Sequence, residues 1–229
     1  MKTPPAPRSF RLIPLGALLL VTACATAAPQ VTPDGLTEVR NTRADALYVR
    51  SGVSFAGYTK VVIIEPTIAF RKDWQADKKM EQPLRPVTDA DMAKMIAMGK
   101  KLLVEQFARA LTKAGYTLAN ETGADVLAIK LAIQDLDVAA PDPNNDAGSS
   151  FNKTYSAASE ATLAIELYDS VTGQLLARAY DRRSGETRSS SSATERTQQT
   201  NITDASYAMG QWARLLVKGL EDAKAAKVP

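Results

Sequence analysis

Carboxylates are the side chains in this sequence best placed for acid–base chemistry. The 229 residues include no histidine, which excludes Ser-His-Asp and Cys-His relays and imidazole zinc sites. A single cysteine, Cys24, also excludes an internal disulfide and a thiolate metal cluster. Asp135 and Asp137 stand two apart on an expected strand, where they would face the same side as an acid–base pair. A strand end entering a polar loop explains these two acids equally well.

Two further motifs depart from the patterns that they resemble. The segment 142–148 is similar to the start of a calcium loop, but Ala147 stands where glycine is needed and Lys153 where a bidentate carboxylate is needed. Ser150 and Lys153 have the spacing of the serine–lysine pair of penicillin-recognising enzymes, yet they lie in an expected loop, and Tyr155 replaces a glycine. We therefore expect no catalytic residue, no cofactor and no metal, and a protein that is not an enzyme.

The N-terminal segment indicates export and lipid attachment. Three basic residues precede an apolar run, 12–21, that fits a signal peptide and is too short to span a membrane. The run ends in Val21-Thr22-Ala23-Cys24, which resembles the lipobox of bacterial lipoproteins. We predict a signal peptide at 1–23, cleavage before Cys24, and acylation of Cys24 with chains such as palmitate. An ordinary signal peptide with a chance cysteine and a buried apolar segment are the alternatives.

Cleavage removes the positive net charge of the chain. Of 28 Lys and Arg, the three in the signal segment leave with it, so 25 face 25 Asp and Glu in the mature protein. The charge therefore predicts no nucleic-acid partner. Ala25 follows the cysteine where, in the lipoproteins that it resembles, aspartate favours the inner membrane. We expect the outer membrane, the domain in the periplasm, and the membrane as a partner through the acyl chains. Another envelope protein is a further candidate partner, and the oligomeric state stays open.

The rest of the chain reads as a tether followed by one domain. Residues 24–45 are rich in small residues, lack periodicity and predict a flexible tether to a single domain at 46–229. Val61–Ile64 predicts a strand buried on both faces. Thr88 can cap a helix running over about 89–114, and Gly115 suits its left-handed end.

Alternating strands and a second long helix complete the predicted fold. Apolar residues alternate over 124–138 and 160–168, and 174–181 returns as the second arm of a hairpin. After a Ser/Thr/Gln-rich linker at 185–200, an apolar stripe runs from Ala205 to Ala223. We predict an α+β fold: a mainly antiparallel sheet with two long helices packed on one face, in strand-helix-strands-helix order.

Three surfaces could bind a partner or a ligand. The outer face of the sheet should carry opposite charges that pair across strands; its members are Lys130, Gln134, Glu160, Glu166, Arg178 and Arg182. Arg71, Lys72 and Trp74 form a candidate partner contact, although the tryptophan could instead pack onto the core. Met92, Met95 and Met98 suit either a core or a pliable apolar pocket between helices and sheet.

Several short segments together resemble one family. They are Pro33-Asp34-Gly35-Leu36, Ala46 to Val49, Tyr58-x-Lys60-Val61-x-Ile63-x-x-Pro66, Glu166 to Gly173, and Asp181-Arg182-Arg183-x-Gly185. The sequence resembles the bacterial lipoproteins catalogued as domain of unknown function 3313. These are strand and turn determinants, so the resemblance implies a lipoprotein and a fold, but no reaction or ligand. The element order is also similar to that of envelope modules that assist transport or assembly machines, by fold alone.

Three functions follow from these features. The first is a non-catalytic periplasmic binding or scaffold module anchored to the outer membrane. The second is a lipid or small-molecule carrier that uses a groove between the helices and the sheet. The third is an enzyme with clustered acids in a cleft.

Overall fold

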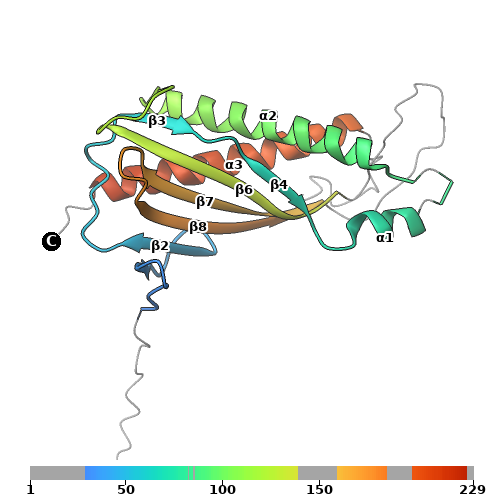
Figure 1. The fold of residues 1–229 in the computed structure, drawn as a ribbon, viewed down its shortest axis with the longest axis horizontal. Helices are drawn as coiled ribbons and strands as arrows, with labels where there is room; N and C mark the ends of the chain where they lie inside the picture. Colours follow the sequence, from blue (N-terminus) through green and yellow to red (C-terminus); the bar gives the residue numbers. More distant parts are fainter. Residues whose placement is uncertain (1–28, 82, 85, 139–158, 185–197, 226–229) are drawn as a thin grey trace, which may run out of the picture.

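The computed structural model describes residues 29–81, 83–84, 86–138, 159–184 and 198–225 (Figure 1). Side chains of the last segment are described from residue 202 onward. Several predictions therefore lie outside the described residues: the signal peptide, the lipobox with Cys24, the calcium-like loop, and the Ser150–Lys153 pair.

Eight strands in the described part of the chain form one mixed sheet. They are β1 (Leu36–Glu38), β2 (Ala46–Arg50), β3 (Lys60–Ile63), β4 (Thr67–Phe70), β5 (Thr117–Leu118), β6 (Val126–Asp137), β7 (Glu160–Asp169) and β8 (Leu175–Ser184). Their order is β1-β2-β8-β7-β6-β3-β5, and β4 also pairs with β6. The pairings of β3 and β4 with β6, and of β3 with β5, are parallel, whereas the others are antiparallel. The predicted α+β class and the mainly antiparallel sheet are confirmed.

Three helices accompany the sheet: α1 (Trp74–Glu81), α2 (Asp89–Lys113) and α3 (Gln198–Ala225). Helix α2 begins with a capping box. Thr88 Oγ1 accepts a hydrogen bond from the backbone N–H of Asp91 at 3.2 Å, and the Asp91 carboxylate accepts one from the backbone N–H of Thr88 at 3.0 Å. Gly115 follows with a φ of 90°, a conformation that glycine adopts without steric cost. The predicted helix at 89–114 is thus confirmed to within one residue. Helix α1 was not predicted, and α3 begins inside the expected linker.

The long helices and the sheet share one hydrophobic core. In Figure 1, α2 and α3 run side by side. Alternate residues of β6 (Leu127, Ile129, Leu131 and Ile133) join Leu103, Phe107 and Leu111 of α2 and Met209, Trp212, Leu216 and Leu220 of α3. Burial of these apolar side chains is the main favourable term that stabilises the domain. Among the described residues, no helix is long and apolar enough to cross a membrane.

Two sequence predictions about the N-terminal half are wrong in part. The tether was expected to reach residue 45, but Leu36 is fully buried and β1 pairs with β2, so folded structure begins earlier. The turn before β1 needs Gly35, whose φ is 78°. The strand at 61–64 was expected to be buried on both faces, yet Ile64 is 42% exposed. Only the two-residue strand β5 lies beyond β3, so this part of the sheet is close to an edge and to solvent.

Candidate functional site

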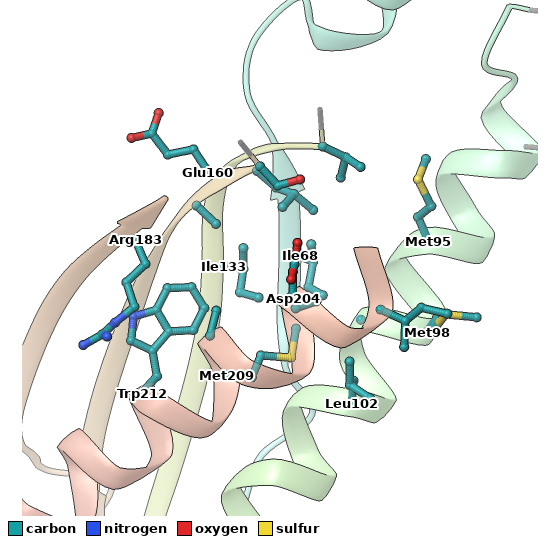
Figure 2. Close-up of a pocket in the computed structure, with 18 of the residues that line it drawn as sticks. Ile68, Met95, Met98, Leu102, Ile133, Glu160, Arg183, Asp204, Met209 and Trp212 are labelled. Carbon is teal, nitrogen blue, oxygen red and sulfur yellow. The ribbon is translucent and has the colours of Figure 1, made fainter. Parts of the chain in front are cut away.

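An apolar cavity of about 220 Å³ lies between α2, α3 and the sheet. Figure 2 shows Met95, Met98 and Leu102 on α2 facing Met209 and Trp212 on α3, with Ile68 and Ile133 on the strands between them. We call it the methionine cavity, and its other apolar lining residues are Gly99, Leu136, Val138, Ala161, Ile202, Ala205 and Ala208. Two of the three methionines that suggested a pocket, Met95 and Met98, line it.

Small residues and flexible thioethers shape this cavity. Gly99 lets α2 approach β4, because a Cβ at this position would come within 2.7 Å of Ile68 Cδ1. Met209 is 5% exposed and lies inside, whereas Met98 is 43% exposed. Unbranched, polarizable methionine side chains adapt to irregular apolar shapes. The volume is larger than a cavity that holds benzene, about 150 Å³, and smaller than sites for drug-sized ligands. The cavity therefore suits one ring or a short aliphatic chain.

Charged side chains also line the methionine cavity, and Asp91, Glu160 and Arg183 each bind a neighbouring residue of the fold. The hydrogen bond from the Thr88 side chain lowers the pKa of Asp91, and the bond from Arg182 lowers the pKa of Glu160. Arg183 Nε donates to Asp181 at 2.7 Å. The two acids are thus held ionised, which makes them poor proton donors near neutral pH. Most of the described lining is apolar.

A buried carboxylate fixes one wall of the cavity. Asp181 on β8 is 6% exposed, and its Oδ2 also accepts a hydrogen bond from Trp212 Nε1 at 2.9 Å. This bond joins the sheet to α3 and orients the indole that lines the cavity. The sequence indicated Asp181 only as part of a family segment, and its role as a buried hydrogen-bond acceptor was not predicted. The signal was available, because Asp181 continues the inward-facing alternation of Ala177 and Ala179 along the hairpin arm.

Two of the three residues of the candidate partner contact, Arg71 and Trp74, bind other residues of the domain. Trp74 is 1% exposed, stacks on Phe70 with ring centroids 4.4 Å apart, and donates through Nε1 to Asp137 at 3.1 Å. Arg71 Nε binds Asp137 at 2.6 Å, and the same guanidinium pairs with Asp77 of α1. The hydrogen bonds to these two carboxylates raise the pKa of Arg71 above its ordinary range. Of the two alternatives for Trp74, the structure shows packing. Lys72 is the member of this segment that is exposed.

The two acids expected to act as a pair are held differently. A β-bulge interrupts β6 between Gln134 and Asp137, and Asp135 within it has a φ of 51°. The regular alternation on which the predicted pair depended is therefore absent. Asp137 binds Arg71 and Trp74 instead. The described residues also contain no cluster of acidic, cysteine or histidine side chains that could hold a metal ion.

The predicted ion pairs on the outer face of the sheet are confirmed. Glu166 stands opposite Arg178 in the register of β7 and β8, and its carboxylate lies 2.8 Å from Arg178 Nε. Lys130 Nζ forms a second ion pair with the same carboxylate at 3.3 Å. Burial tends to raise the pKa of Glu166, but hydrogen bonds from Tyr168, Arg178 and Lys130 outweigh burial and lower it. Arg182 pairs with Glu160 at 2.7 Å. These charges neutralise one another within the domain.

Comparison with known proteins identifies a family. The family model described as protein of unknown function (DUF3313) matches residues 28–216. No curated protein matches the chain significantly. The PelC dodecamer from Paraburkholderia phytofirmans is a similar solved structure, with 12% identity, a TM-score of 0.36, and coverage of 72% of this chain and 93% of that one. Protein XCC0632 from Xanthomonas campestris has 10% identity and a TM-score of 0.37, and the match covers 86% of this chain and 98% of that one. A minor lipoprotein from Acinetobacter baumannii has 13% identity and a TM-score of 0.30, and the match covers 72% of this chain and 92% of that one.

Proposed function

The chain belongs to the DUF3313 family of proteins of unknown function, and from this premise we propose that it is a lipid-anchored, non-catalytic binding module of the bacterial cell envelope. Within that class, the role that the geometry supports best is a carrier of a small apolar ligand. The observation that carries this proposal is the methionine cavity, a hollow of about 220 Å³ lined by apolar side chains. Ligand sites of this kind are concave, mostly apolar and few in number.

The position of the cavity supports the proposal that two long helices pack on one face of the sheet. Two long helices on one face of the sheet would leave such a hollow wherever small side chains meet between the helices and the sheet. Its lining combines residues of α2 and α3 with residues of β4, β6 and β7. Close packing normally fills interior space, so an unfilled apolar region between well-packed helices favours an exchangeable occupant. We include this arrangement of the two helices in the proposal.

The anchor and the location rest on the N-terminal sequence. Val21 to Cys24 supports acylation of Cys24, and Ala25 supports the outer membrane over the inner one. Two or more acyl chains hold a protein stably at a bilayer, whereas one chain gives only reversible binding. The domain would then lie in the periplasm, close to a source of apolar molecules.

A scaffold that binds another envelope protein is supported less well. Hot spots of protein interfaces are commonly exposed aromatic or arginine anchors. Trp74 is buried, and Arg71 is held between two carboxylates at 2.6 Å each. The charges of the outer sheet face are paired as well. A carrier is therefore the first hypothesis to test.

Native mass spectrometry of the full-length protein, extracted from envelopes in mild detergent, tests the proposal. We expect the mass of residues 24–229 plus acyl groups, and a non-covalent small apolar molecule that delipidation removes. Ala208→Leu places extra atoms in the methionine cavity and should abolish that adduct. Ala97→Leu is the matched control, because Ala97 is exposed on α2 and outside the cavity. An unlipidated precursor mass would refute the anchor, and an adduct that survives Ala208→Leu would refute the carrier.

A further inference from the structure

A second, larger cavity lies at another place in the domain. Its volume is about 390 Å³, and it is enclosed by β2, β7, β8, α3 and the segment 39–44. We call it the β2–α3 cavity. It shares no lining residue with the methionine cavity. Its apolar lining consists of Leu47, Val49, Phe55, Ile165, Leu167, Ala177, Ala179, Leu215, Leu216, Gly219, Leu220 and Ala223, with Val39 and Ala44 at the edge.

Small residues on facing elements keep the β2–α3 cavity open. Ala177 and Ala179 on β8 line the cavity together with Gly219 and Ala223 on α3, and larger apolar side chains at these positions would reduce its volume. A Cβ added at Gly219 would meet no atom within 4 Å. Glycine lowers the stability of a helix interior by about 1 kcal/mol relative to alanine, so local stability does not account for its presence. The volume falls in the range of small-molecule sites, about 300 to 1,000 Å³.

The edge of this cavity carries one unbalanced positive charge. Arg40 pairs with Glu38 at 3.5 Å, Asp222 pairs with Lys218 at 2.9 Å, and Arg178 pairs with Glu166 at 2.8 Å; these three residues line the cavity edge. Arg43 also lines the edge and is exposed, and it makes no ion pair within the part of the chain that the structure describes. An apolar interior beside an uncompensated guanidinium is complementary to an apolar chain with an anionic head.

We propose that the β2–α3 cavity binds one acyl chain of an anionic amphiphile, whose head group lies at Arg43. This site is separate from the methionine cavity, so it goes beyond the proposed function and does not depend on it. A fatty acid carboxylate and a lysophospholipid phosphate offer the same chemistry to a guanidinium. The two sources are distinguished by testing each one as a probe.

The test is a binding titration of the full-length protein in detergent, followed by native mass spectrometry. The probes are palmitate, lysophosphatidylglycerol, and hexadecanol as an uncharged chain. Gly219→Leu should weaken binding of the preferred anionic probe at least tenfold, because its side chain extends into the open space. Gly219→Ala is the matched control and should bind as the wild type does. Both substitutions raise helix propensity, so loss of binding would not reflect an unfolded helix.

Charge is tested separately from shape. Arg43→Glu should weaken binding of the anionic probe about fivefold or more and leave hexadecanol unchanged, as expected for one lost charge contact. Arg109→Glu changes an exposed arginine outside the cavity and should have no effect. Preference for palmitate or for lysophosphatidylglycerol would assign the head group. Unchanged binding in Gly219→Leu would overturn the site, and equal wild-type binding of hexadecanol and both anionic probes would overturn the anionic ligand.

Discussion

Replacement of Asp181 tests whether one buried hydrogen bond holds α3 against the sheet. In Asp181→Ala, the indole N–H of Trp212, a residue that is 2% exposed, loses its acceptor. A buried donor left without a partner costs about 1 to 3 kcal/mol. The bond from Arg183, whose side chain is 33% exposed, contributes up to about 1 kcal/mol more because water screens it. We expect the free energy of unfolding to fall by about 1 to 4 kcal/mol.

Urea denaturation followed by tryptophan fluorescence measures this change. With a slope of about 2 kcal/mol per molar urea, the midpoint should fall by about 0.5 to 2 M. Asp181→Asn keeps an oxygen acceptor for the indole and should lose less than half as much. Trp212→Phe removes the donor, and Trp74 remains as the fluorescent reporter. A double-mutant cycle between Asp181 and Trp212 should then give a coupling energy of about 0.5 to 3 kcal/mol.

Two outcomes would refute this reasoning. Glu121→Ala changes an exposed acid and serves as the surface control, with an expected effect below about 0.5 kcal/mol. If Asp181→Ala is no more destabilising than Glu121→Ala, the buried bond does not stabilise the fold. A coupling energy near zero would show that Asp181 acts through another neighbour.

Three further predictions concern separate features. Thr88→Ala removes the side chain that caps α2 and should lower the free energy of unfolding by about 1 kcal/mol in urea; no change would contradict the capping role. Glu166→Gln should destabilise the protein by about 1 to 2 kcal/mol at neutral pH and not in strong acid. Because the pKa of Glu166 is lowered in the folded protein, its ionised form stabilises the fold at pH values above the unfolded-state pKa. That contribution is lost as the pH falls through the folded-state pKa. The melting temperatures of the wild type and of Glu166→Gln should therefore converge in acid. Burial, together with hydrogen bonds to acids, raises the pKa of Tyr58 and of Tyr168 to about 12. In a spectrophotometric titration both should therefore ionise near pH 12; Tyr58→Phe and Tyr168→Phe should each remove one step in that range, and a titration without such steps would contradict the two bonds.

Features that depend on neighbours in the sequence were predictable. The capping box at Thr88 and the left-handed turn at Gly115 follow from side-chain and backbone chemistry within a few residues. The pairing of Glu166 with Arg178 follows from strand alternation together with a short turn, which sets the register of the hairpin. That Met95 and Met98 lie on one apolar side of α2 was also predictable, because they recur at helical spacing.

Other features depend on which elements meet. Trp74 could pack or bind a partner, and its burial was decided by Phe70 and Asp137, the latter far away in the sequence. The bulge at Asp135 and the parallel pairing of β3 and β4 with β6 are likewise set by tertiary contacts.

The sequence by itself determined the α+β class, the caps and turns, and the apolar side of most elements, because backbone geometry repeats over a few residues. Only the tertiary structure decided where the cavities lie. A void arises when small residues of distant segments come together, as Ala177 and Gly219 do in the lining of the β2–α3 cavity, and no local pattern records which segments those are. The same holds for Asp181, whose burial requires a partner from α3.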